Sequence, residues 1–176
     1  THELRKFCLL MLKKNGYVLE QLHSPLVVAT SPLHEELKAI GARCVTRHHW
    51  HHYAGFAQTQ WKLFNKDQPR RAKPLLYVIR ILLAGIHLMR TGEIEANLPR
   101  LNERFGLGYV PELIERKRLG AEHGTLGEAD LAFFEAEVAR LHAELAEAAA
   151  RTALPDEAAG RDELHELLVR TRLAGL

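Results

Sequence analysis

The chain has 176 residues, of which 47% are hydrophobic, and its formal net charge at pH 7 is +2. This length and composition suit one globular domain, or one domain with an appendage, and allow a hydrophobic core. The near-neutral charge gives no global argument for binding to nucleic acid or to a membrane. With Cys8 and Cys44 as the two cysteines, the chain can form neither a disulfide framework nor a four-cysteine zinc site, and its charged start does not resemble a signal peptide. We therefore expect a cytoplasmic protein.

The first 41 residues are expected to form three short helices. Apolar residues recur at helical spacing from Glu3 to Lys14, and Asn15-Gly16 is expected to end that helix. A second helical run covers residues 17–23, and residues 26–29 are expected to be extended or irregular, and buried. Ser31-Pro32 is a favourable helix start, because serine caps the helix and proline fits its first position.

The middle of the chain contains the most apolar segment. A helix over residues 45–64 and a basic loop over residues 65–72 lead into Lys73–Gly92. That last segment is apolar on nearly every side between residues 75 and 89, which predicts a helix buried at the centre of the fold. The segment is short for a membrane span, and Arg80 near its centre argues against one.

Four further helices and a boundary are expected after residue 93. Residues 94–105 form a short helix interrupted by Pro99, and residues 110–119 form another. Residues 120–124 are expected to separate a part covering 1–120 from an appendage covering 121–176. The spacing of Thr125 and Glu128 predicts a capping box at the start of the appendage. A narrow apolar seam follows, which packs more often on its own domain than on a partner: Leu131, Phe134, Val138, Leu141 and Leu145.

Taken together, these patterns predict a mainly α fold. The expected architecture is a multi-helix bundle around a buried central helix at about residues 73–91, with a C-terminal helical hairpin in which Leu164, Leu167 and Leu168 mark the last helix.

One stripe of the central helix is polar. Lys73, Tyr77, Arg80 and His87 follow one another at helical spacing. Because arginine keeps its charge in proteins, Arg80 needs either an acidic partner or an anionic ligand. The structural alternative pairs it with Glu20, Glu93 or Glu95, and the functional alternative makes the stripe a wall that binds the phosphates or sugar of a nucleotide. Spacing alone does not decide between them.

A cluster of histidines lies before the central helix. His48 and His52 are four residues apart on a helix and could share a metal ion, with Cys44 one turn earlier. The catalytic zinc motif requires a glutamate directly after the first histidine, and that residue is His49. Imidazoles at a helix start, some of them facing a phosphate site, are the favoured interpretation, and no metal ligand is assigned.

Positive charge is concentrated between residues 37 and 92, where Asp67 is the one acidic residue. Such a basic region suits phosphates, although the short run Arg70-Arg71-Ala-Lys73 is by itself typical of a solvated loop. The chain contains no Gly-Lys-Ser/Thr phosphate loop and no Asp-x-Asp pair. No complete set of catalytic residues is present, so none is assigned.

Several phrases resemble one known family. These phrases are Leu4-Arg-Lys-Phe7, Val18-Leu-Glu-Gln-Leu22, His52-Tyr-Ala-Gly-Phe-Ala57, Lys73 through Tyr77 and Leu88-Met-Arg-Thr-Gly-Glu93. In this order they resemble the helical part of nucleotidyltransferases of the DNA polymerase β superfamily that are associated with RNA repair. The resemblance covers roughly residues 1–120, and it departs at His52, where the family pattern has serine.

The resemblance implies a function for the polar stripe. In that superfamily a small catalytic palm carries a Gly-Ser turn and metal-binding carboxylates, and a helical part closes over the nucleotide. Position by position, Tyr53, Lys73, Tyr77 and Arg80 would hold the nucleoside triphosphate or the RNA end. The catalytic palm, its Gly-Ser and Asp-x-Asp motifs and its Mg²⁺ would belong to an upstream domain of the complete enzyme.

The sequence therefore predicts the substrate-binding portion of a Mg²⁺-dependent nucleotidyltransferase acting on nucleotide or RNA ends, with no chemistry of its own. The alternatives are a stand-alone helical module that binds RNA or nucleotide without catalysis, a metal protein built around His48 and His52, and an inert scaffold in which Arg80 is paired internally.

Overall fold

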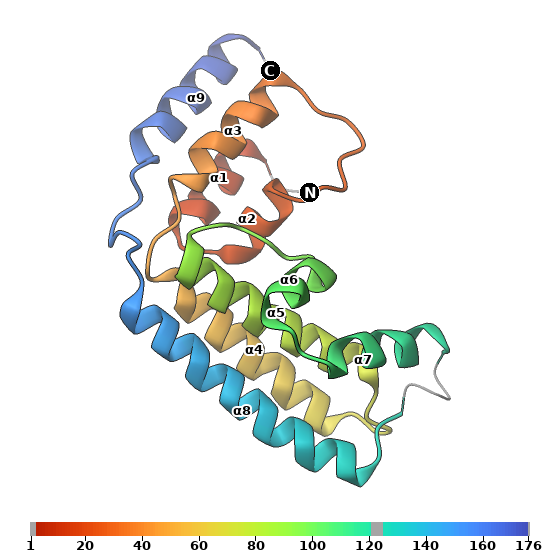
Figure 1. Ribbon diagram of the computed structural model, residues 1–176. Helices are drawn as coiled ribbons and strands as arrows, with labels where there is room; N and C mark the ends of the chain where they lie inside the picture. Colours follow the sequence, from red (N-terminus) through yellow and green to blue (C-terminus); the bar gives the residue numbers. More distant parts are fainter. Residues whose placement is uncertain (1–2, 121–124, 176) are drawn as a thin grey trace.

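The computed structural model describes residues 3–120 and 125–175 (Figure 1). Within these ranges the chain forms nine helices and no strand, and it is 71% helical. The helices are α1 (Leu4–Leu12), α2 (Gly16–Leu22), α3 (Pro32–Ala42), α4 (His49–Lys66), α5 (Ala72–Thr91), α6 (Leu98–Phe105), α7 (Tyr109–Arg118), α8 (Glu128–Arg151) and α9 (Arg161–Leu173). The prediction of a mainly α fold is confirmed.

Helix α5 is the centre of the molecule, as its composition predicted. Its side chains are buried almost continuously from Leu75 to Met89, and α4, α6, α7 and α8 all pack on it. Gly92 ends the helix with a φ of 75°, a left-handed conformation that glycine adopts without steric cost. By length and composition alone α5 could cross a membrane, but 78% of its most apolar window is buried inside the fold. Burial by neighbouring helices therefore accounts for its apolar character.

The two C-terminal helices pack on different parts of the preceding chain (Figure 1). Helix α8 lies along α4 and α5, and four residues of its apolar seam are buried there: Phe134, Val138, Leu141 and Leu145. Helix α9 packs on α1 and α3 at the opposite end of the molecule. There Cys8 and Cys44 are buried, and Gly160 approaches the Cys44 sulfur so closely that a Cβ at residue 160 would lie 3.0 Å from it. The seam thus packs on helices of residues 1–120 rather than within the C-terminal part, and α8 and α9 do not form the expected hairpin because each packs on a different part of the preceding chain.

The boundary expected at residues 120–124 lies largely outside the described residues, which stop at Gly120 and resume at Thr125. Just after the gap, the Leu126 amide donates a hydrogen bond to the Arg70 carbonyl at 3.0 Å. Arg71 and Thr125 form an isolated antiparallel bridge beside it. The start of the C-terminal part is therefore tied to the basic loop that precedes α5.

The expectation that residues 26–29 are buried is wrong. Leu26 is 89% exposed and Val28 is fully exposed, at 104%. An extended apolar segment is buried when neighbouring strands or helices cover it, and the described residues offer this segment no strand to pair with. Ser31 then starts α3 by accepting a hydrogen bond from the His34 amide, as the Ser-Pro pattern predicted.

Three predicted helix ends are also wrong. Helix α1 ends at Leu12, and Lys14 rather than Gly16 takes a left-handed conformation, while Asn15 caps α2 by accepting from the Tyr17 amide. Helix α6 starts only at Leu98, so Pro99 lies in its first turn and interrupts nothing. In α8 the predicted capping box is displaced. Its first helical residue is Glu128, and the Asp130 carboxylate accepts a hydrogen bond from the Gly127 amide at 3.2 Å.

Candidate functional site

Arg80, in the middle of α5, forms an ion pair with Glu20 of α2. The Nη1 atom donates to the Glu20 Oε2 atom at 2.8 Å, and the side chains are 17% and 9% exposed, respectively. Burial opposes the charged form of Arg80, but the carboxylate of Glu20 outweighs it and raises the pKa of the guanidinium. The acidic partner that the sequence left open among three glutamates is thus Glu20.

Two aromatic rings complete the surroundings of Arg80. Its guanidinium carbon lies 5.0 Å from the centroid of the Tyr77 ring, within the range of a cation–π contact. The Tyr77 ring in turn meets Phe56 of α4 edge to face, with centroids 5.8 Å apart. One turn of α5 therefore places the Arg80 guanidinium against the Tyr77 ring, and that ring is in contact with Phe56 of α4.

A cavity of about 670 Å³ lies beside this turn, between α4, α5, α6 and α7. Three of the four residues predicted to bind phosphate line it, namely Lys73, Tyr77 and Arg80. Its other lining residues are Gln60, Arg71, Pro74, Leu76, Leu98, Pro99, Ile114 and Lys117. Of all the described residues that line the cavity, four have cationic side chains and none is acidic. The four are Arg71, Lys73, Arg80 and Lys117. Arginine and lysine donors on an otherwise apolar wall suit an anionic ligand with a planar or apolar part.

The cations differ in their partners. Arg80 is paired with Glu20, and Arg71 is paired with Asp67 at 3.1 Å. Lys73 and Lys117 are both exposed, and across residues 3–120 and 125–175 neither lies within 4 Å of a carboxylate. These two ammonium groups are therefore the ones most available to a ligand.

Sequence reasoning missed Gln60, Arg71 and Lys117. Arg71 was interpreted as part of a solvated loop, but as the residue before α5 it lines the cavity together with Lys73. Lys117 lies in the basic run at the end of α7, and Gln60 is on α4. The basic run at the end of α7 was the one feature of the sequence that could have pointed to Lys117. Only the tertiary packing brings α4 and α7 together beside α5.

Tyr53, the fourth predicted residue, lies deeper. It is 2% exposed and is not among the cavity's lining residues. A Cβ at Gly16 or at Gly85 would lie 2.7 Å from Tyr53 atoms, so α2 and α5 both approach this side chain closely. Burial, the charge of Glu20 and a hydrogen bond to it raise the pKa of Tyr53 well above its usual range. Tyr53 is therefore connected to Arg80 through Glu20.

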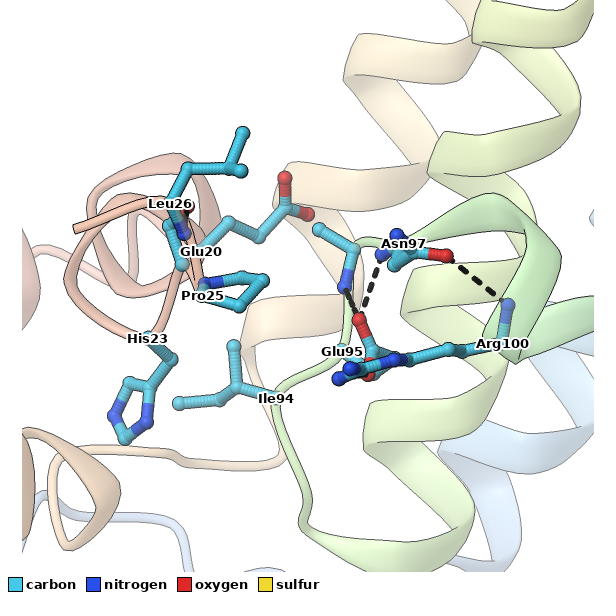
Figure 2. A pocket seen from close by; sticks show the side chains of 10 residues that line it. Glu20, His23, Pro25, Leu26, Ile94, Glu95, Asn97 and Arg100 are labelled. Atoms are coloured by element: carbon cyan, nitrogen blue, oxygen red, sulfur yellow. Dashed lines mark hydrogen bonds and ion pairs between the residues drawn. The ribbon is translucent and has the colours of Figure 1, made fainter.

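A second, smaller cavity of about 280 Å³ is lined in part by Glu20 (Figure 2). Its wall includes Glu20, His23, Glu95 and Arg100. The Glu95 carboxylate accepts hydrogen bonds from the amides of Ala96 and Asn97 at 2.9 and 2.7 Å, which fixes the loop before α6. This cavity therefore carries carboxylates, unlike the one lined by Lys73 and Arg80.

The histidine cluster is spread over the first turns of α4. His49 is buried, and His48 lies 3.2 Å from the Asp156 carboxylate. His52 lies edge-on against Tyr53, with ring centroids 5.5 Å apart. Within residues 3–120 and 125–175, no group of three or more His, Cys, Asp or Glu side chains is arranged to hold a metal ion.

In its described residues the chain is thus an all-helical protein with a cavity lined by four cationic side chains and no acidic one. The sequence matches the RlaP family, described as the RNA repair pathway DNA polymerase beta family, over residues 1–170, and the chain belongs to this family. An uncharacterized protein of Methanocaldococcus jannaschii is 35% identical over 97 residues, which make up 55% of this chain and 40% of that relative. The match thus takes in less than half of the relative's length. No solved structure matches the chain significantly.

Proposed function

We propose that the chain is the helical substrate-binding portion of a nucleotidyltransferase, and that the cavity lined by Lys73, Tyr77 and Arg80 holds the phosphates of a nucleoside triphosphate or of an RNA end. One observation carries this proposal: four cationic side chains and no acidic one line a single cavity among the described residues. Membership of a polymerase β family concerned with RNA repair supplies the class of ligand.

The roles follow from the chemistry of each side chain. Lys73 and Lys117, which have no acidic partner among residues 3–120 and 125–175, would pair with phosphate oxygens as mobile point charges. Arg80 is held by Glu20 and would add a fixed positive charge at the cavity wall. The Tyr77 ring and the apolar residues of α6 and α7 would contact the sugar or the base.

Magnesium is the cofactor expected of nucleotidyltransferases of this superfamily, but the described residues do not fit it. They contain no carboxylate cluster that could hold an ion, and the whole sequence contains no Asp-x-Asp pair. Our proposal therefore assigns Mg²⁺ and the chemistry to carboxylates of an upstream catalytic domain, and assigns to this chain only the binding of substrate.

Isothermal titration with ATP in the presence of EDTA tests the site. The Lys73→Gln/Lys117→Gln variant should bind ATP at least about tenfold more weakly than the parent, since two charge-assisted contacts are lost. The matched control is Lys62→Gln/Lys66→Gln, which removes the same charge from α4 outside the cavity. Equal affinities of the two variants would refute the assignment.

A second experiment tests the absence of chemistry. Incubation of the chain with labelled ATP, Mg²⁺ and an RNA acceptor should give no nucleotidyl transfer. Transfer that is lost on substitution of Glu93 or Glu95 would show instead that the chain carries its own catalytic carboxylates.

A further inference from the structure

A different basic cavity, of about 610 Å³, lies between the end of α1 and the first turns of α4. Its wall carries five basic side chains, Lys13, Lys14, His48, His51 and His52, together with Leu10 and Asn15. No carboxylate is among these described lining residues. Of the five, His48 lies 3.2 Å from the Asp156 carboxylate, which is 69% exposed, and His52 interacts electrostatically with Glu20.

The backbone adds to the positive character of this cavity. Helix α4 has 18 residues and begins at His49, and its first turn contains no acidic residue. The His48 side chain does not cap the helix either. The start of a helix carries partial positive charge even though the His49 and His51 amides donate to the Thr46 and His48 carbonyls, and His48 and His51 line the cavity together with Lys13 and Lys14.

Lys14 has an unusual backbone conformation. Its φ of 63° lies in the left-handed region, and among the described residues it is the one non-glycine residue with positive φ. Glycine or asparagine is favoured at this position after a helix, because a Cβ is crowded there. Lys14 therefore follows α1 in a conformation that glycine would adopt at a lower steric cost.

An aromatic groove of about 610 Å³ adjoins this cavity and shares His51 with it. Trp50 and Trp61 line the groove, and the Trp50 and His51 rings are 4.2 Å apart. Aromatic rings beside a basic cavity are the arrangement with which proteins stack bases while holding the backbone phosphates of a single strand.

We propose that the cavity formed by Lys13, Lys14, His48, His51 and His52 binds a backbone phosphate of single-stranded RNA, with a neighbouring base against Trp50 and Trp61. This second site does not depend on the nucleotide site at Lys73 and Arg80. It would bind the RNA strand at nucleotides away from its end.

Fluorescence anisotropy with a labelled single-stranded RNA of twelve nucleotides tests this proposal. The Lys13→Gln/Lys14→Gln variant should bind the RNA at least about tenfold more weakly than the parent, whereas its affinity for ATP should be unchanged. The Lys6→Gln/Lys66→Gln variant loses the same charge elsewhere and should retain RNA binding. Two results would overturn the proposal: equal RNA affinities of the two double variants, or a parallel loss of ATP binding, which would make the site one for mononucleotides.

The Lys14→Gly variant separates binding from folding. Glycine relieves the left-handed backbone, so we expect Tm to rise by about 2 to 4 °C while RNA affinity falls. A rise in Tm with unchanged RNA affinity would mean that Lys14 does not contact the strand. A variant that is stabilised yet binds weakly cannot have lost affinity by unfolding.

Discussion

The guanidinium of Arg80 and the carboxylate of Glu20 are 2.8 Å apart, and each lines a different cavity. Glu20 faces the cavity that includes Glu95, and Arg80 faces the cavity that includes Lys73 and Lys117. The pair thus lies between a cavity lined by side chains of both charges and one whose charged lining residues, among those described, are all cationic. A ligand phosphate in the basic cavity would have to share Arg80 with Glu20.

Breaking this pair should be costly. The Glu20→Gln variant leaves Arg80 buried without a counter-charge, and we expect a loss of about 3 kcal/mol in the free energy of unfolding. Glu20→Gln/Arg80→Met removes both charges and should recover most of the loss. Urea denaturation followed by circular dichroism measures these differences.

The control for this prediction is Glu36→Gln, which breaks an exposed ion pair with Arg170 and should cost less than about 1 kcal/mol. If Glu20→Gln lowered the free energy of unfolding no more than this control does, the ion pair between Arg80 and Glu20 would contribute nothing to stability.

The same substitution should strengthen anion binding. With Glu20 neutral, Arg80 no longer has a competing carboxylate, so the affinity for ATP should increase severalfold under conditions in which the variant is folded. Titration calorimetry of Glu20→Gln against the parent measures this. Unchanged or weaker ATP binding would place the phosphates away from Arg80.

Two helical glycines should respond in opposite directions to alanine. In Gly85→Ala the new Cβ would lie 2.7 Å from the Tyr53 Cβ and 3.1 Å from Leu145, and such overpacking should cost about 2 kcal/mol. Gly55 has open space around its Cβ position in the middle of α4. Gly55→Ala should therefore stabilise the protein by about 0.5 to 1 kcal/mol through helix propensity. Thermal unfolding of both variants gives the comparison, and a stable Gly85→Ala variant would contradict the close approach of α4 and α5.

Acid should destabilise the fold through buried histidines. Burial is the main cause that lowers the pKa of His49 to about 4, and burial also lowers the pKa of His23, His52, His87 and His142. The unfolded chain therefore binds more protons than the folded chain between about pH 6.5 and pH 4. Stability is fully present above that window and falls as the pH decreases through it, by about 3 kcal/mol at pH 4 from His49 alone.

Urea denaturation at pH 7, 6 and 5 measures this slope. His49→Gln removes one of the titrating groups, and its stability should depend less steeply on pH. If the stability of this variant depended on pH as steeply as that of the parent, the pKa of His49 would be the same in the folded and the unfolded chain.

The central helix was predictable because it is apolar on nearly every side and Arg80 near its centre argues against a membrane span. A segment apolar on every side must be buried, and Thr91-Gly92 supplies its end. For the same reason Lys73, Tyr77 and Arg80 could be placed on one stripe, since the spacing within a helix is fixed. That they bind an anion remains a prediction.

The remainder of the site depends on distant elements. Lys117 and Gln60 reach the cavity from α7 and α4, and no local pattern in the sequence relates them to α5. Glu20 was one of three possible partners for Arg80, and only the packing of α2 near α4 and α5 selects it. The exposed residues 26–29 were misplaced because apolar composition predicts burial only where a neighbouring element supplies the cover.

The two buried thiols have a practical consequence. Burial raises the pKa of Cys8, and it raises that of Cys44 to about 11, so at neutral pH both sulfurs stay protonated and react slowly with alkylating reagents. Both lie at the end of the molecule built from α1, α3 and α9, and the chain has no other cysteine. The rate of alkylation under native conditions would therefore report how often that end opens, separately from the bundle around α5.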